Sequence, residues 1–189
     1  THRQSQSQGS VLPGRFQLVV TLMSIPRPAL RTIRAEDRDF LFRVYASTRL
    51  EELALTHWDE TQKQAFLVQQ FEAQDHHYRT HYPGARLDLI VLGGEPVGRL
   101  YVARWKEEMR IMDIVLLPEH RDRGVGGGLL RDLLAEAAAT GRRLTIHVER
   151  YNPALRLYQR LGFEPVGETG VYLLLAVEPP TDRPADPLR

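Results

Sequence analysis

The segment between Leu116 and Leu130, LLPEHRDRGVGGGLL, constrains the fold more than any other part of the sequence. The apolar run 111–117 predicts a β-strand that ends at Pro118, and a helix is expected to begin at the glycines that follow. Because glycine has no Cβ, it lets the backbone turn tightly and come close to a ligand. The first amides of a helix have no acceptor within the helix, so they form a site for an anion. The segment therefore predicts a loop that binds pyrophosphate.

Two arginines, Arg121 and Arg123, add positive charge beside these glycines. A P-loop would require Gly-Lys-Ser/Thr after its second glycine, whereas Gly126 is followed by Gly-Gly-Leu. A dinucleotide-binding loop would require a third glycine where Leu129 stands. The remaining alternative is an ordinary glycine-rich connection between a strand and a helix, because short glycine motifs often match by chance.

A second motif lies downstream, at residues 152–163, with the sequence NPALRLYQRLGF. The first motif, Arg121-x-x-Gly124-x-Gly126 after a strand, resembles motif A of the GCN5-related N-acetyltransferase (GNAT) family, Arg/Gln-x-x-Gly-x-Gly/Ala. Residues 152–163 resemble that family's second signature, Asn-x-x-Ala/Ser-x-x-x-Tyr-x-x-x-Gly-Phe, with the small residue two positions after the asparagine. Two signatures in this order and spacing are far more specific than either one. The resemblance covers Arg31–Glu178.

Hydrophobic periodicity and turn residues predict an alternation of strands and helices along this region. The expected strands are 30–34, 87–92, 97–105, 111–117, 144–148, 163–166 and 171–177, and the expected helices are 35–49, 61–81, 126–140 and 153–161. The order β-α-α-β-β-β-α-β-α-β-β is that of a single GNAT fold. The resemblance therefore implies the α/β (α+β) class, with a mixed, mostly antiparallel central sheet and helices on both faces.

Length and composition are those of one globular domain of 189 residues. Residues 29–178 are expected to form it, between a flexible extension, 1–28, and a flexible tail, 179–189; Met23 is a candidate alternative start. The net charge of +1 gives no general attraction to nucleic acid, and the absence of cysteine excludes disulfides and thiolate chemistry. No apolar run approaches the roughly 20 residues needed to span a bilayer. We expect a soluble, cytoplasmic protein without nucleic-acid or membrane partners.

The resemblance implies acetyl-CoA as the co-substrate. In the family, the strands on either side of the glycine loop and its helix separate, and the pantetheine arm pairs with their free backbone groups like an added strand. Here those strands are 111–117 and 144–148. The pyrophosphate would rest on the amides from Arg123 to Gly128. The residues that the resemblance assigns to the cofactor are Leu116, Leu117, Arg121, Arg123, Gly124, Val125, Gly126, Gly127, Gly128, Asn152 and Tyr158.

The same resemblance makes Tyr158, six residues after Asn152, the acid that protonates the departing thiolate. Its alternative role is that of a helix aromatic packed on the sheet. The oxyanion formed during attack by a primary amine would meet a backbone amide near Leu116 or Leu117.

Three residues compete for the role of the base that takes the amine's proton. Alternation along 144–149 places His147 and Glu149 on one face of the strand, with Thr145. His147 falls where ribosomal-protein N-terminal acetyltransferases of this family carry their catalytic glutamate, and histidine titrates near working pH. A hydrogen-bonded sheet histidine is the alternative. Asp113 is the second candidate and Glu149 the third, whereas the position of the GCN5-type glutamate is occupied by Arg110.

Other polar residues give weaker signals. His77 and His81 lie one helical turn apart, but no third ligand is evident, so we expect no metal site. An acidic group in the loop between the first two helices can border the acceptor site and attract a cation, or can be a solvated loop. It comprises Glu51, Glu52, Asp59 and Glu60. Four aromatic residues belong either to the acceptor pocket or to the core: Tyr45, Trp58, Tyr78 and Trp105.

Two functions remain. The first is acetyl-CoA-dependent acetylation of a small amine or an exposed protein amine. The second is a non-catalytic acyl-CoA-binding module that regulates a partner. Tyr158 and a titratable His147 favour the enzyme, because a sensor needs only the glycine loop. The oligomeric state stays open, although members of the family often pair as homodimers through sheet edges and terminal hairpins.

Overall fold

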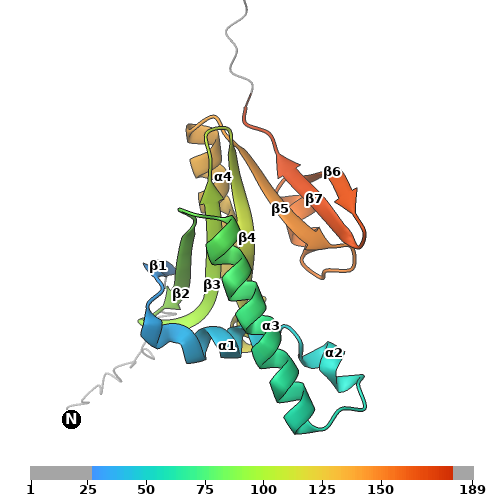
Figure 1. Cartoon of the computed structure of the whole chain (residues 1–189). Coiled ribbons are helices and arrows are strands. Elements are labelled where there is room, and N and C mark those ends of the chain that lie inside the picture. The colour runs from blue at the N-terminus through green and yellow to red at the C-terminus, as the bar shows by residue number, and fades with distance from the viewer. Residues whose placement is uncertain (1–26, 181–189) are drawn as a thin grey trace, which may run out of the picture.

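A computed structural model describes residues 27–180. The expectations for the extension before Arg27, including a start at Met23, and for the tail after Pro180 lie outside the described residues. The remainder is built around one seven-stranded sheet in the order β1-β2-β3-β4-β5-β7-β6 (Figure 1). The strands are β1 Ala29–Thr32, β2 Arg86–Leu92, β3 Glu95–Arg104, β4 Glu108–Leu116, β5 Arg143–Glu149, β6 Glu164–Thr169 and β7 Tyr172–Val177.

Helices cover both faces of the sheet, so the predicted fold class is confirmed. The helices are α1 Arg38–Ser47, α2 Leu50–Ala54, α3 Glu60–His81, α4 Val125–Ala139 and α5 Leu155–Arg160, with single 3₁₀ turns at Ala35–Asp37 (η1) and Pro118–His120 (η2). Helix α3 crosses the front of the sheet in Figure 1, and α4 lies behind it. Helix α2 falls in a segment expected to be a loop. It forms because Leu53 is buried in the core beneath α1 and α3.

Helix α3 begins where its sequence provides a cap. The Asp59 carboxylate accepts a hydrogen bond from the Gln62 amide (2.8 Å), and the Gln62 side chain accepts one from the Asp59 amide (3.0 Å). This reciprocal arrangement satisfies two amides that the first turn of a helix leaves without partners. Asp59 is therefore the N-cap of α3.

The apolar side chains form one cluster on each face of the sheet. The larger joins α4 and α5 to alternate residues of β3, β4, β5 and β7, including Met109, Ile111 and Ile146. The smaller packs α1, α2 and α3 against Leu89 of β2. Residues of β5 that alternate with the larger cluster, Thr145 and His147, therefore lie on the α3 side of the sheet.

The β4–β5 pair is the one parallel pair of the sheet, and it is short. Its register runs from Glu108↔Arg143 to Ile111↔Ile146. Beyond this point β4 stays paired with β3, and β5 with β7, but β4 and β5 no longer pair with each other. At the point of separation the β3–β4 register shifts, and Met112 has no partner on β3. The predicted separation of the two strands is thus present.

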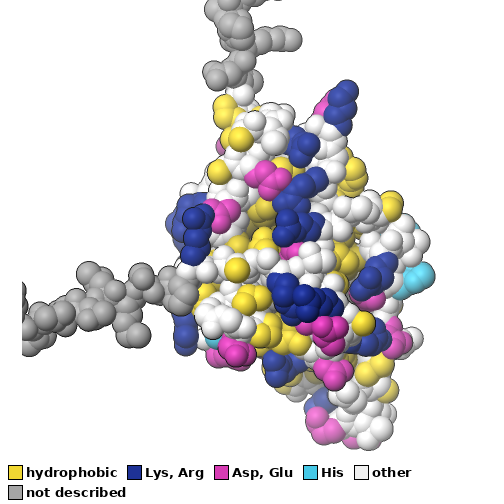
Figure 2. All heavy atoms as spheres, turned by 90° about the vertical axis from the view of Figure 1, so that its left-hand side faces the viewer, with side chains coloured by type: hydrophobic (Ala, Val, Ile, Leu, Met, Phe, Trp, Pro, Cys, Tyr) yellow, Lys and Arg dark blue, Asp and Glu magenta, His cyan; other side chains and the backbone are white. Residues whose placement is uncertain are grey.

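Basic and acidic side chains are interspersed with apolar ones on the face seen in Figure 2. This mixture agrees with a net charge of only +1. Within residues 27–180, no helix combines the length and apolar composition that a bilayer span requires.

Candidate functional site

A cavity of about 1030 Å³ opens beside the separated strands. The end of β4, the loop after it, the first turns of α4 and most of α5 form its wall, and Thr48 from the α1–α2 junction also reaches it. Its lining residues are Thr48, Ile114, Val115, Leu116, Arg121, Asp122, Gly124, Gly126, Gly127, Leu130, Arg131, Asn152, Pro153, Ala154, Arg156, Leu157, Tyr158, Arg160 and Leu161. Both sequence motifs therefore meet at one hollow.

The N-terminus of α4 is open toward this cavity. Its N-cap is Gly124, in the left-handed conformation (φ 80°) that favours glycine, and there is no side-chain cap and no acidic residue in the first turn. The Gly128 amide donates to the Gly124 carbonyl (2.9 Å), so it already belongs to the helix. The amides from Arg123 to Gly128 were predicted to bind an anion, but the amide of Gly128 is not available. The free amides in the first turn of the helix are those of Val125, Gly126 and Gly127.

The free edge of β4 is formed by alternate residues. The Leu117 amide donates to the Val97 carbonyl of β3 (2.9 Å), so this amide is not free for the ligand contact that the sequence predicted. Because backbone groups alternate in direction along a strand, Ile114 and Leu116 direct theirs toward the gap. The Leu116 carbonyl accepts a hydrogen bond from Arg121 Nε (2.9 Å), which fixes that arginine at the cavity wall.

Three further arginines, Arg131, Arg156 and Arg160, line the cavity and were not predicted from the sequence. The Arg131 side chain reaches back along α4 to Gly127, where an added Cβ would lie 3.6 Å from its Nη1. Among the described residues, none of the three forms an ion pair, although most arginines elsewhere do. A signal did exist in the sequence. Residues 127 and 131, like 156 and 160, are one helical turn apart.

The remaining residues assigned to the cofactor occupy different places. Asn152 lines the cavity, and its Oδ1 accepts a hydrogen bond from the Ala154 amide (2.8 Å), which shapes the turn before α5. Arg123 is exposed and does not line the cavity. Asp122 does line it, with a left-handed backbone (φ 57°).

Tyr158 is packed in the core and also borders the cavity. It is only 4% exposed and packs edge-on against Phe163, with ring centroids 5.6 Å apart. It also lines the cavity. Burial, and then the nearby charge of Asp113, raise the pKa of its phenol. The hydroxyl therefore stays protonated at neutral pH and can act as a proton donor.

The three candidate bases lie on the α3 side of the sheet and do not line the cavity. His147 is exposed on β5, where partial desolvation, and then the charge of Arg110, lower its pKa against the opposing effect of Glu108. Asp113 forms an ion pair with the buried Arg99 (2.6 Å), which also donates to Gln74 of α3 (2.7 Å).

Glu149, the third candidate, is exposed at the end of β5, and the Tyr172 hydroxyl donates to it at 3.5 Å.

Of the four aromatic residues named from the sequence, Tyr45 is in the core, Tyr78 is half-buried on the sheet, and Trp58 and Trp105 are each 41% exposed. The rings of His77 and His81 stack 4.4 Å apart, and residues 27–180 contain no group of three metal-ligating side chains.

Comparisons with known proteins agree with this architecture. A family model, the Acetyltransferase (GNAT) family, matches residues 45–163, and no curated protein matches the sequence. PaiA N-acetyltransferase from Thermoplasma acidophilum, in complex with coenzyme A, has 14% identity and a TM-score of 0.62, over 80% of this chain and 98% of that one. An acetyltransferase from Thermus thermophilus has 23% identity and a TM-score of 0.60, over 82% of this chain and 99% of that one.

A third structure, spermidine N-acetyltransferase from Vibrio cholerae in complex with CoA and spermine, has 16% identity and a TM-score of 0.57, over 80% of this chain and 95% of that one. At such identities these likenesses establish the fold. The family model spans more than half of the chain and includes both motifs at the cavity. The protein therefore belongs to the GNAT acetyltransferase family.

Proposed function

We propose that the protein transfers the acetyl group of acetyl-CoA to a primary amine. The observation that carries this proposal is one continuous cavity that joins the open N-terminus of α4, the free edge of β4 and the Tyr158 side chain. The similar structures provide further support. The Thermoplasma acidophilum enzyme is in complex with coenzyme A, and the Vibrio cholerae enzyme is in complex with CoA and the amine spermine.

The cavity wall suits the chemistry of the co-substrate. The phosphate groups would be held by the free amides of α4 and by four arginines that form no ion pair within residues 27–180: Arg121, Arg131, Arg156 and Arg160. The amide-bearing arm would lie between β4 and β5, where the groups of Ile114 and Leu116 have no strand to pair with. The same gap leads from the phosphate end to Tyr158.

The reaction requires two proton transfers at this gap. The acceptor ammonium first loses a proton to solvent. The nitrogen of the neutral amine then attacks the thioester carbonyl, and a base removes a second proton from it; His147 is our first choice, Asp113 the second and Glu149 the third. The carbon–sulfur bond then breaks, and Tyr158 donates its phenolic proton to the departing thiolate. A backbone amide near Leu116 would meet the oxyanion that forms between these steps.

The acceptor would be a small amine or an exposed amine of another protein. Thr48 brings the cavity to the α1–α2 junction, and the exposed Glu51 and Glu52 follow directly on α2. Glu52 is paired with Arg49 (3.1 Å), so Glu51 supplies the net negative charge at this border, which would attract a cationic amine by long-range electrostatics.

Thiol release from acetyl-CoA with a panel of amines, including spermidine and peptides, tests the proposal. We expect Tyr158→Phe to lower kcat by about 100-fold or more, the usual contribution of a general acid, without changing the affinity for acetyl-CoA. Tyr151→Phe, at a residue that is 89% exposed, is the matched control and should behave as the wild type. Full activity in Tyr158→Phe would remove that residue from the mechanism.

Tight acetyl-CoA binding without turnover on any amine would instead favour a non-catalytic acyl-CoA-binding module. Failure to bind acetyl-CoA at all would contradict both functions.

A further inference from the structure

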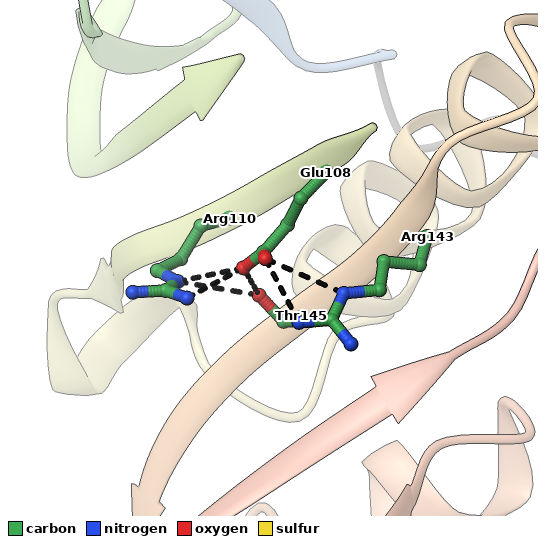
Figure 3. A network of polar contacts seen from close by, with 4 residues as sticks. All are labelled: Glu108, Arg110, Arg143 and Thr145. Atoms are coloured by element: carbon green, nitrogen blue, oxygen red, sulfur yellow. Dashed lines mark hydrogen bonds and ion pairs between the residues drawn. The ribbon is translucent and has the colours of Figure 1, made fainter. Parts of the chain in front are cut away.

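Four polar side chains connect β4 and β5 at the end where these strands are still paired (Figure 3). The Glu108 carboxylate accepts hydrogen bonds from Arg110 (2.6 and 2.9 Å), from Arg143 (3.0 and 3.3 Å) and from the Thr145 hydroxyl (2.6 Å). One carboxylate thus holds two guanidinium groups on the α3 side of the sheet. The cluster as a whole carries a charge of +1.

Strand register places the first of these cations, Arg110, within two residues of His147. Arg110 lies opposite Thr145, and its Nε also approaches the Thr145 hydroxyl (3.4 Å). His147 is the next residue of β5 on the same face, about 6.6 Å along the strand at about 3.3 Å per residue. The guanidinium of Arg110 also stacks over the Trp105 ring, 5.1 Å from its centroid, so its position is fixed from two sides.

We propose that Glu108 holds Arg110 beside His147 as a fixed positive charge, which makes Arg110 a positioning residue that keeps the imidazole in its neutral, proton-accepting form. This inference rests on the acetyl transfer proposed above, with His147 as the base. A second positive charge on the imidazole would be repelled by the guanidinium, so the ring is left free to take a proton from the amine.

The charges around His147 are consistent with this assignment. On β4 the nearest charged residue in the register is Arg110, opposite Thr145, and Glu108 follows opposite Arg143; on β5 the nearest is Glu149, which pairs with Tyr172 of β7, and Leu174 of β7 lies opposite His147. The α4 side of β5 is apolar. Partial desolvation and Arg110 lower the pKa of His147, and Glu108 opposes them without cancelling them.

Arg143 offers a matched control, because it binds the same carboxylate but lies four residues from His147, about 13 Å along the strand. Of the two arginines, Arg110 is the one whose charge acts on the pKa of His147. Arg110→Gln and Arg143→Gln remove the same charge and weaken the same cluster. They differ in their distance from the imidazole.

The experiment is an NMR titration of the His147 ring, identified by the signals that His147→Gln removes, together with the pH dependence of kcat/KM. We expect Arg110→Gln to raise the pKa of His147 and to move the acid limb of kcat/KM to higher pH. Activity is then lost in the acidic range and preserved on the alkaline plateau. Arg110→Lys should restore most of the wild-type profile, and Arg143→Gln should not shift it. If Arg110→Gln does not fold, Arg110→Met takes its place.

An unchanged His147 titration in Arg110→Gln overturns the inference, as does an equal shift in Arg143→Gln, which would indicate general loosening of the sheet. A shifted titration with an unshifted acid limb would also overturn it, by removing His147 from proton transfer. Failure of the proposed function is separate, because the wild-type protein would then release no thiol at any pH while the ring still titrates.

Discussion

The two ends of the β4–β5 pair use the same residue type in opposite ways. At the paired end, Arg110 and Arg143 share the Glu108 carboxylate, and the strands are bonded rung by rung. At the separated end, Arg121 and Arg131 face a cavity with no acid paired to them among the described residues. Arginine therefore stabilises the sheet where it is paired with a carboxylate, and prepares a site for an anionic ligand where it is not. Folding and binding are divided between the two ends of one strand pair.

The largest effect on acetyl-CoA binding should come from a large side chain placed in the cavity at the separated end of the β4–β5 pair. Gly126→Trp is expected to weaken acetyl-CoA binding by more than about 100-fold, because an indole there would occupy the space of the phosphates. The nearest atom to a Cβ at this position is Leu116 Cδ1 at 3.8 Å, so the free energy of unfolding should change little. Isothermal titration calorimetry gives the affinity, with Gly128→Ala, which meets open space, as the control. Equal affinities would show that the ligand lies elsewhere.

The complementary change removes the carboxylate that joins the two strands at their paired end. Glu108→Ala leaves two guanidinium groups without their acceptor, and a half-buried cluster of this kind should cost about 2 kcal/mol of unfolding free energy. Urea denaturation measures this loss, and the affinity for acetyl-CoA should stay within about twofold of the wild type because the cavity is untouched. A large loss of affinity without a loss of stability would contradict the division between the ends.

A smaller effect distinguishes an unpaired arginine from a paired one. Arg131→Ala should weaken acetyl-CoA binding about tenfold, or about 1.4 kcal/mol, and the affinity of the variant should depend less on salt. Arg104, bound to Glu136 at the other end of α4 (2.6 and 2.8 Å), provides the contrast. Arg104→Ala should lower stability and leave the affinity unchanged. Identical effects of the two substitutions on affinity would refute the distinction.

The smallest effect is a change in how the free energy of unfolding depends on pH in the acidic range. Burial acts to raise the pKa of Glu108, but hydrogen bonds from Thr145, Arg143 and Arg110 outweigh it and hold the pKa below its ordinary value. A carboxyl group whose pKa is lowered by folding stabilises the protein above its unfolded pKa, and this contribution is lost as pH falls through the folded pKa. Chemical denaturation between pH 7 and pH 3 should therefore show a shallower acid loss in Glu108→Gln than in the wild type.

Periodicity and glycine chemistry predicted most of the fold, because most strands and the helices α1 and α4 have an apolar repeat of their own. They missed the first residues of β4, where Glu108 and Arg110 look like a solvated turn in the sequence. Their pairing depends on Arg143 and Thr145, more than thirty residues away, and a local pattern does not contain that information. Helix α2 was missed for a related reason, since Leu53 becomes a core residue only when α1 and α3 enclose it.

The candidate site was predictable where a motif defines it. Gly124, Gly126, Asn152 and Tyr158 all line the cavity, as the two signatures implied. The contact expected of the Leu117 amide failed, because its hydrogen bond to Val97 depends on the phase of the β3–β4 pairing. A strand pattern shows which side chains share a face, but it does not show toward which neighbour each amide turns.

The brevity of the β4–β5 pairing has a mechanical consequence. Four rungs alone connect the β1–β4 part of the sheet to the β5–β7–β6 part by strand pairing, and the apolar cluster beneath α4 supplies the rest of the junction. A ligand that enters the gap like an eighth strand would connect the two parts by further hydrogen bonds to the backbone of β4 and β5. Amide protons on both sides of the gap should then exchange more slowly with solvent deuterium.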